Sequence, residues 1–384
     1  MKHVLAGLLL LCGILAGCGG SQSGPAADGG DTVALKYAQR LTIVRHKGYT
    51  QVDIVDPWKA HRILHTYFLV PQGAAHDTLA QRLRGRRTST AVEAKSVVRT
   101  PVTRSVVFTT VHASLLMELG AGGAISGVCD LKYMNLPWIH HQVKAGRIAD
   151  CGNGMNADVE RVITSRPGAL LISPFENSGG YGKLDGIGIP IIETADYMET
   201  SALGRAEWMK FYGMLFGREA EAERLFARVD SNYQALARRA ATSHPRPSVV
   251  TELKTGSVWY VPGGQSVVST MLADAGGRYV FAADKKQGSL GLSFEKVLDV
   301  GGQADIWIYK YDTHPATLAE LAASYAGYKE MKAWKTGRVY GCNTLGTTYY
   351  EEASFHPDRV LRDFIIILHP DLQLGPLRYY HRIS

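Results

Sequence analysis

The stretch "MNADVERVITSRPGALLIS" (Met155–Ser173) predicts a short helix, a Pro-Gly break and then a buried strand. The segment "SFEKVLDVGGQADIWIYK" (Ser293–Lys310) repeats the same order in the second half of the chain. In each segment the second apolar run is short and follows a turn signal, which favours a strand over a helix. Because short apolar strands that alternate with helices form parallel sheets covered by helices, the two segments indicate two α/β halves.

A long helical pattern from Ala202 to Ala241 connects these halves. Its second part carries a regular apolar stripe, which includes Ala222, Leu225, Phe226, Val229, Tyr233 and Leu236. The pattern is interrupted near "FGRE" (Phe216–Glu219), so we expect a break there.

The region before Arg104 has a different pattern. Residues Tyr37–Gly73 alternate apolar and polar side chains between turn signals, which predicts a small antiparallel β-meander. Residues Leu79–Arg99 are basic and contain Ser and Thr, and we interpret them as a surface connection.

The first residues, "MKHVLAGLLLLCGILAGC", have the form of a secretory signal: Lys2, a short apolar run and small residues before Cys18. The ending "LAGC" resembles the lipobox of bacterial lipoproteins, in which the cysteine is lipidated after cleavage. The Gly- and Ser-rich residues up to Asp31 are typical of a flexible tether. We therefore expect an extracytoplasmic protein held at the membrane by a lipid on Cys18.

Charge and cysteine content bear on the possible partners and on disulfide bonds. The net charge of +7 is spread among charges of both signs over 384 residues, which does not favour nucleic acid as a partner. Three cysteines remain in the folded part, and their placement favours Cys129 with Cys151 over pairs with Cys342, without showing the geometry.

Other motifs do not support catalysis or a nucleotide site. "GAGGAISG" (Gly120–Gly127) closes a helix instead of opening one, so Gly120 is a helix C-cap candidate rather than part of a dinucleotide fingerprint. No GxSxG elbow is present. The histidines, together with Glu351 and Glu352, match no metal-ligand spacing; they are His112, His140, His141, His314, His356 and His369.

From about Arg104 to Leu372 the order of segments resembles the class III periplasmic substrate-binding proteins of ABC importers, which carry ferric siderophores, haem or cobalamin. The segments that carry this resemblance are "SVVFTTVHASLLMELGAGGAISGV", "GNGMNADVERVITSRPGALLIS", "LDGIGIPIIE", "YVPGGQSVVSTMLADAGG", "LSFEKVL", "ADIWI", "YKEMKAWKTGRVY" and "LHPDL".

The resemblance implies an α/β fold of two Rossmann-like lobes joined by a long rigid helix, with the β-meander as an N-terminal extension. It implies a monomer without enzymatic activity or cofactor that hands its ligand to an ABC transporter permease dimer. In the family, one acidic residue on each lobe docks into arginine pockets of the permease, and the matching positions are Glu160 and Glu295. Each also lies in a first helical turn, where the helix dipole alone favours an acid.

We expect the ligand in the cleft between the lobes, at loops that follow strands. The candidates are His112, Asn153, Met155, Asn156, Tyr181, Trp259, Tyr260, Tyr309, Tyr349 and Tyr350. Such aromatic and amide side chains suit a large, partly apolar ligand, although Trp259 and Tyr349 fit a core role equally well.

Few arginines occur in these loops, which favours a near-neutral chelate such as a hydroxamate siderophore or a corrinoid. Receptors for haem or a free metal ion remain alternatives, as does an extracytoplasmic α/β enzyme with Glu176 and Glu351 as acid and base. The predicted organisation is a signal peptide (1–17), a tether (18–31), the extension (32–100), an N-terminal lobe (101–200), a helical region (201–245) and a C-terminal lobe (246–384).

Overall fold

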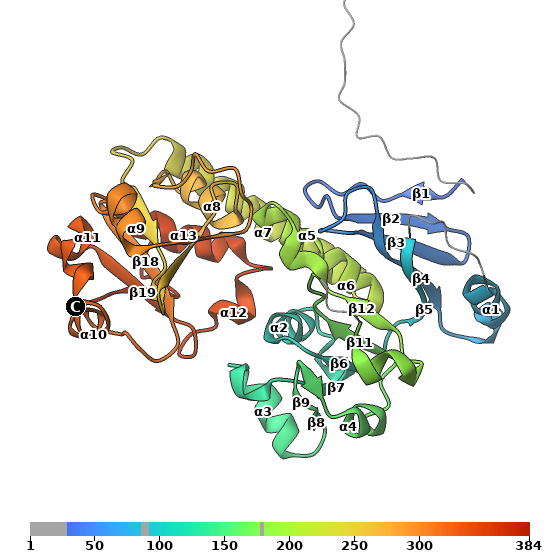
Figure 1. Cartoon of the computed structure of the whole chain (residues 1–384). Coiled ribbons are helices and arrows are strands. Elements are labelled where there is room, and N and C mark those ends of the chain that lie inside the picture. The colour runs from blue at the N-terminus through green and yellow to red at the C-terminus, as the bar shows by residue number, and fades with distance from the viewer. Residues whose placement is uncertain (1–28, 86–91, 177–179) are drawn as a thin grey trace, which may run out of the picture.

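The computed structural model describes residues 29–85, 92–176 and 180–384. The predicted signal peptide and Cys18 lie outside these ranges. Three five-stranded sheets and a long helix dominate the fold (Figure 1). Within the described ranges no helix is both long and apolar enough to cross a membrane.

The N-terminal extension is a sheet in the order β1-β2-β3-β4-β5. Strands β2, β3 and β4 form the predicted antiparallel meander. The interpretation of residues 79–99 as a surface connection was wrong, because helix α1 leads there into β5, which pairs in parallel with β4. The basic residues of this segment obscured the apolar periodicity of α1, in which Ala80 and Leu83 pack against the sheet. The elements are β1 (Asp31–Thr32), β2 (Leu41–His46), β3 (Tyr49–Val55), β4 (Ile63–Pro71), α1 (Asp77–Gly85) and β5 (Val92–Thr100).

Two buried glutamates fasten the extension to the helices that link the lobes. The carboxylate of Glu207 accepts hydrogen bonds from the amides of residues 36, 37 and 38, at 2.7–2.9 Å. The carboxylate of Glu199 accepts from the amides of Gln39 and Arg40, at 3.0 and 2.8 Å. Since buried carboxylates need such partners, these contacts explain why Glu199 and Glu207 are tolerated in the interior.

The N-terminal lobe contains a parallel sheet in the order β12-β11-β6-β7-β8, as the alternation of strands and helices predicts. Gly120, the predicted C-cap of α2, lies one residue beyond the observed C-cap Leu119, and its φ of 74° is the left-handed conformation that ends a helix. The elements are β6 (Ser105–Val107), α2 (Thr110–Glu118), β7 (Ile125–Val128), α3 (Pro137–Lys144), β8 (Ala149–Asp150), β9 (Gly152–Asn153), β10 (Asn156–Ala157), α4 (Val159–Thr164), β11 (Ala169–Ile172) and β12 (Ile191–Glu193).

The C-terminal lobe contains a sheet in the order β16-β13-β18-β19-β20, in which only β20 runs antiparallel. A separate antiparallel sheet, β14-β15-β17, lies beside it. The elements are β13 (Ser248–Thr251), β14 (Lys254–Thr255), β15 (Val258–Pro262), α8 (Val267–Asp274), β16 (Arg278–Tyr279), β17 (Ser289–Leu292), α9 (Phe294–Gly301), β18 (Ile306–Tyr311), α10 (Leu318–Ser324), α11 (Lys332–Lys335), β19 (Val339–Asn343), α12 (Tyr349–Glu352), α13 (Pro357–Leu368) and β20 (Tyr380–Arg382).

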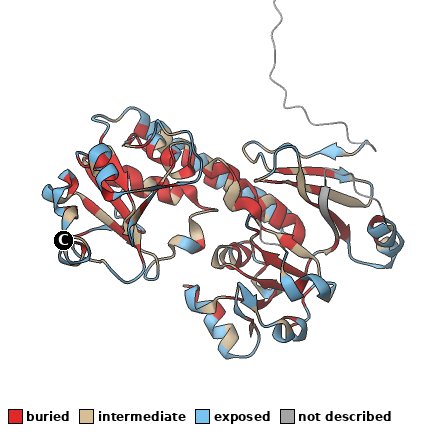
Figure 2. Cartoon of the chain, in the orientation of Figure 1, coloured by how far each residue is buried: buried red, intermediate tan, exposed pale blue. Residues whose placement is uncertain are grey.

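Helix α7 (Glu219–Ala241) runs diagonally between the lobes, after α5 (Ala202–Glu207) and α6 (Met209–Phe216) (Figure 1). The predicted break is present: Gly217, with a φ of 65°, ends α6 in a left-handed conformation that favours glycine. The buried stripe of α7 includes Ala222, Phe226 and Tyr233, as predicted. Figure 2 shows the buried residues following this helical path from one lobe to the other.

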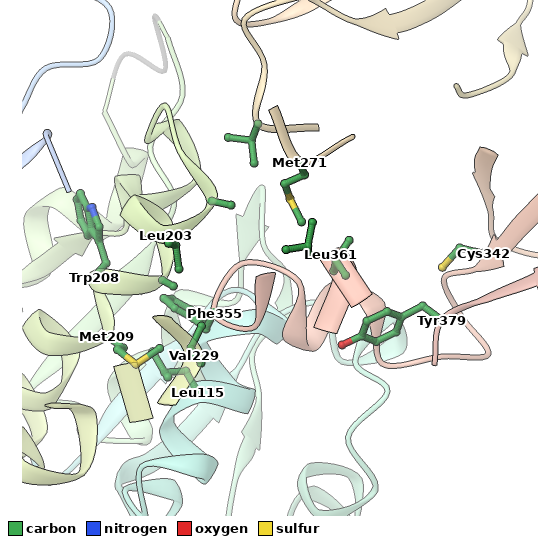
Figure 3. Packing of buried hydrophobic residues seen from close by; sticks show 14 of the residues in the cluster. Leu115, Leu203, Trp208, Met209, Val229, Met271, Cys342, Phe355, Leu361 and Tyr379 are labelled. Atoms are coloured by element: carbon green, nitrogen blue, oxygen red, sulfur yellow. The ribbon is translucent and has the colours of Figure 1, made fainter. Parts of the chain in front are cut away.

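One hydrophobic core runs through both lobes and the linking helices. Figure 3 follows it from Leu115 on α2 through Val229 on α7 to Leu361 on α13 and Tyr379 in the C-terminal lobe. Because close-packed interiors deform little, this continuity favours small relative motions of the lobes over wide hinge opening.

Cys129, Cys151 and Cys342 are all buried and free, so the pair that the sequence favoured, Cys129 with Cys151, does not form a disulfide. Burial and the nearby acidic residues Asp150 and Asp158 raise the pKa of the Cys151 thiol to about 11. Such a thiol is a small core side chain with little reactivity.

Candidate functional site

The two lobes meet at the carboxyl ends of their parallel strands. Glu351 on α12, which follows β19, accepts hydrogen bonds from the Thr110 hydroxyl at 2.7 Å and from the Asn135 amide at 2.8 Å. Thr110 follows β6 and Asn135 follows β7, so the ends of both sheets face each other at this point. Glu351 is buried at the lobe interface, where this carboxylate joins the lobes.

A second contact lies further along the same interface. The His356 ring at the start of α13 bonds through Nε2 to Glu118 Oε2 of α2, at 2.5 Å. Burial opposes protonation, but hydrogen bonds to Asp358 and Glu118 raise the pKa of His356 overall. Arg228 of α7 also lies 3.7 Å from Glu118, so this carboxylate contacts both lobes and the linking helix.

A cavity of about 720 Å³ lies in the N-terminal lobe at the ends of β6 and β11. We call it the N-lobe cavity. Two of its lining side chains, Met155 and Phe175, are strongly exposed, 77% and 46% respectively. The predicted residues Asn156 and Tyr181 also line it, as does Glu160, and further lining residues include Phe108, Ile172, Ser173 and Lys183. An apolar wall with a few polar groups is the usual make-up of a small-molecule site.

Two predicted polar residues lie at or next to this cavity: Tyr181 lines it, and Asn153 precedes the lining residues 154–160. The Tyr181 hydroxyl donates to Glu193 Oε1 at 2.8 Å. Burial and the adjacent Glu193 carboxylate raise the pKa of Tyr181, so its hydroxyl remains a neutral donor. Asn153 is exposed and its side-chain oxygen accepts from the Met155 amide at 2.8 Å, which holds the turn that presents Met155.

The C-terminal lobe has a shallower hollow of about 310 Å³ at the end of β13, which we call the C-lobe hollow. Tyr260, 53% exposed, lines it together with Glu252 and Lys310. Lys310 Nζ forms an ion pair with Glu252. Burial opposes the charge, but the Glu252 carboxylate raises the pKa of Lys310, so the lysine stays protonated and its charge is balanced locally.

Two further predicted tyrosines lie near the C-lobe hollow, on α12. Tyr349 is partly buried and borders a small cavity next to Lys310 and Glu252. Tyr350 is 52% exposed. Helix α12 also carries Glu351, so Tyr350 lies close to the point where the lobes meet.

Three predicted ligand-binding residues are instead core residues, and for these the prediction was wrong. Trp259 is fully buried, because side chains alternate along β15 and Tyr260 takes the outward position. His112 lies on the buried face of α2, where its Nε2 contacts Asp196 at 2.9 Å and the Tyr212 hydroxyl at 3.0 Å. Tyr309 is buried in the central strand β18, and its hydroxyl donates to the Pro315 carbonyl at 2.9 Å.

Sequence reasoning placed Lys183 and the loop that contains Phe175 in the cleft, but it missed Phe108 as a lining residue. A usable signal was present, since Phe108 directly follows β6 and Phe175 lies three residues beyond β11. The carboxyl ends of parallel strands are where open α/β sheets bind ligands.

The two predicted docking acids are both exposed in first helical turns. Asp158 caps α4 ahead of Glu160, and Ser293 caps α9 ahead of Glu295. Hydrogen bonds from its own amide and from the Ser293 hydroxyl lower the pKa of Glu295, so it is ionised at neutral pH. Within the described part of the chain, no group of three His, Cys, Asp or Glu side chains is placed to hold a metal ion.

Two joined α/β lobes, with cavities at the facing strand ends, define a two-lobed solute-binding protein. The family model described as "Periplasmic binding protein" matches residues 106–344, and this chain belongs to that family. Its class III members are binding proteins, not enzymes, and serve ABC transporters outside the cytoplasm.

The chain is also similar to a lipoprotein in sequence and to solved structures in fold. An uncharacterized lipoprotein of Methanocaldococcus jannaschii is 25% identical over 370 residues, which cover 91% of this chain and 85% of the relative. A periplasmic heme binding protein from Pseudomonas aeruginosa has a TM-score of 0.58 at 17% identity and covers 74% of this chain and 98% of its own. A possible iron-binding protein from Staphylococcus epidermidis has a TM-score of 0.55 at 20% identity, over 70% of this chain and 100% of its own.

Proposed function

We propose that this protein captures a metal chelate of low net charge between its lobes and delivers it to the permease of an ABC importer. In this proposal the lipid on Cys18 keeps the protein near its transporter. The ligand is a ferric hydroxamate siderophore or a corrinoid. The family assignment and the lipoprotein name of the M. jannaschii relative support the transport and anchoring parts.

The observation that carries the ligand class is the chemistry of the lining side chains. Large apolar or aromatic groups are exposed in both lobes: Met155 and Phe175 in the N-lobe cavity and Tyr260 in the C-lobe hollow. No arginine occurs among the described residues that line either space. A tri-anionic chelate would need several cationic groups, since arginine is the preferred partner for multiple carboxylate-like oxygens.

The lysines nearby do not change this conclusion. Lys310 is neutralised by Glu252, and Lys183 shares the N-lobe cavity with the acidic residues Asp158 and Glu160. The charges around these two spaces therefore attract a multiply charged anion only weakly. The exposed apolar side chains favour a large neutral ligand, because binding buries apolar surface.

Haem is the alternative that the similar P. aeruginosa protein suggests by its name. Haem requires an axial ligand such as tyrosine or histidine. Tyr260 and Tyr350 are exposed, whereas His112 and His356 are buried and engaged in hydrogen bonds. A haem complex of this protein would therefore show the absorption of a tyrosinate-ligated ferric haem.

The test is a binding experiment with coloured probes. Purified protein is mixed with ferrioxamine B, cyanocobalamin, haemin or the tri-anionic ferric enterobactin, and co-elution of colour and quenching of tryptophan fluorescence are measured. We expect micromolar or tighter binding of ferrioxamine B or cyanocobalamin. Exclusive binding of ferric enterobactin or of uncomplexed iron would overturn the proposed ligand class.

Matched variants locate the binding. Phe175→Ala combined with Tyr260→Ala should weaken binding by roughly tenfold or more, because two aromatic contact surfaces are lost. Trp138→Ala is the control, since Trp138 is an exposed aromatic residue on α3 that does not line either space. An equal loss in both proteins would place the ligand elsewhere.

A further inference from the structure

The N-terminal extension covers the free edge of the N-terminal lobe's sheet. The Tyr67 hydroxyl on β4 accepts from the Glu193 amide at 2.8 Å and donates to the Ile191 carbonyl at 3.0 Å. Both partners belong to β12, which is the edge strand of its sheet. Tyr67 is fully buried. Burial and the nearby Glu193 charge raise the pKa of Tyr67 well above the usual value, so its hydroxyl stays protonated. One tyrosine thus satisfies two edge groups that a sheet edge leaves open.

A histidine beside this tyrosine contacts the side chain of Glu193. The His65 ring stacks on Tyr67, with ring centres 4.1 Å apart and planes inclined by 5°. His65 Nδ1 lies 3.1 Å from Glu193 Oε2, and His65 Nε2 lies 3.0 Å from the Ser96 hydroxyl. Because a carboxylate accepts, Nδ1–H donates to Glu193, and in the neutral ring Nε2 then accepts from the Ser96 hydroxyl.

The second oxygen of the Glu193 carboxylate bonds to Tyr181, a residue that lines the N-lobe cavity. Glu193 Oε1 accepts from the Tyr181 hydroxyl at 2.8 Å, and Tyr181 lines the N-lobe cavity. His65 and Glu193 have little solvent exposure, 9% and 12% of their side chains, so water screens this chain of contacts weakly. The extension is thereby connected to the cavity wall through two consecutive charge-assisted hydrogen bonds.

The order hydroxyl, imidazole, carboxylate is also the order used by serine hydrolases. The surroundings of Ser96 do not fit that use. Ser96 lies inside β5, which pairs with β4 along its length, whereas a nucleophilic serine projects from a turn with free amides for an oxyanion. The contacts therefore form an interface, not a catalytic centre.

We propose that the extension is a positioning module for the ligand site: His65, acting through Glu193, sets the orientation of the Tyr181 ring in the cavity wall. This inference rests on the proposed function only in taking the N-lobe cavity as part of the ligand site. Without His65, the Glu193 carboxylate is free to turn toward water, and Tyr181 loses a fixed acceptor. The Tyr181 ring then samples several rotamers. Ligand binding must fix one of them, and this loss of conformational entropy lowers the affinity.

The first test needs no ligand. Hydrogen exchange of the full chain is followed by mass spectrometry for the backbone amides of residues 181–187 in wild type, His65→Ala, His65→Asn and Thr66→Val. We expect several-fold faster exchange in His65→Ala. His65→Asn should restore protection, because the asparagine amide occupies the place of Nδ1 and can donate to Glu193.

Thr66→Val is the matched control. Thr66 is the next residue on β4, is buried, and donates to Asp53 at 2.6 Å within the extension, away from Glu193. It should lower the thermal stability without changing exchange at residues 181–187. Unchanged exchange in His65→Ala, or an equal increase in Thr66→Val, would overturn the proposal.

The second test measures binding of ferrioxamine B and cyanocobalamin. His65→Ala and Tyr181→Phe should each weaken binding of whichever probe the wild type binds by about three- to tenfold, the range expected for one hydrogen bond. The double variant should be no weaker than the worse single variant, because both changes break the same chain of contacts. Additive losses would overturn the positioning role. If the wild type binds neither probe, the proposed ligand class fails, while the exchange experiment still decides the role of His65.

Discussion

Helices α4 and α9 occupy the same place in the two lobes, but their surroundings differ. Each is short, begins at a side-chain cap and carries an exposed glutamate as its second residue. Glu160 borders the N-lobe cavity, together with Met155 and Asn156 from the loop before α4. Glu295 instead follows β17, a strand paired with β15, and the cavity and hollow described above do not include it. Two equivalent sequence units therefore differ in their surroundings: Glu160 lines a cavity, and Glu295 does not.

The largest expected effect concerns delivery. Glu160→Ala together with Glu295→Ala should reduce uptake of radiolabelled chelate in cells that carry the importer by roughly 100-fold, since two charge-assisted docking contacts are lost. Taken singly, Glu160→Ala should also weaken ligand binding a few-fold, whereas Glu295→Ala should leave it unchanged.

Asp299→Ala is the control for this experiment, because Asp299 is an exposed acid on the same helix as Glu295 and pairs only locally with Lys296, at 3.1 Å. Normal uptake in the double variant would remove the docking role of both glutamates. Equal effects of the two single variants on ligand affinity would contradict the expectation that Glu160, but not Glu295, lies next to the ligand.

The second prediction contrasts an aromatic residue from each lobe. Trp259→Ala should lower the free energy of unfolding by about 3–5 kcal/mol, because a fully buried indole leaves a cavity among Phe294, Trp307 and Tyr328. Phe175→Ala should change stability by less than about 0.5 kcal/mol, as an exposed side chain does. Urea unfolding measures both, and a stability loss for Phe175→Ala as large as that for Trp259→Ala would contradict the assignment of Phe175 to the cavity wall.

The smallest expected effect concerns the caps. Ser293→Ala and Asp158→Ala should each lower stability by about 1 kcal/mol, because each removes the acceptor for an amide in the first turn, Lys296 N at 3.2 Å or Arg161 N at 3.1 Å. Thermal unfolding of the two variants provides the comparison, and no change in either would contradict the capping role.

Ser293→Ala should also raise the pKa of Glu295 toward its usual value, since the Ser293 hydroxyl helps to lower it. A carboxyl whose folded-state pKa is lowered stabilises the fold above its usual pKa of 4.5, and this contribution disappears as the pH falls through the folded-state pKa. NMR titration of Glu295 in both proteins measures the shift, and an unchanged pKa would show that the backbone amide alone is responsible.

Elements with regular periodicity could be predicted from the sequence. The alternating residues of β2–β4, the stripe of α7 and the repeated helix–strand units are local patterns, and the structure confirms them. Helix α1 and strand β5 were missed, because their basic side chains masked a narrow apolar face at Ala80 and Leu83. Position after a strand placed the loop of Phe175 in the cleft, and the same argument would have identified Phe108.

The sequence by itself determined the class of fold, because hydrophobic periodicity decides which segments become helices or strands and which faces they bury. The family resemblance marked Glu160 and Glu295 as matching positions, one in each repeated helix–strand segment. Only the tertiary structure decided which aromatic side chains are exposed: Tyr260 points outward and its neighbour Trp259 inward, as the register of β15 against its partner strands requires. It alone decided that His65, more than a hundred residues away in sequence, contacts Glu193 behind Tyr181, since contacts between distant segments depend on how whole elements pack.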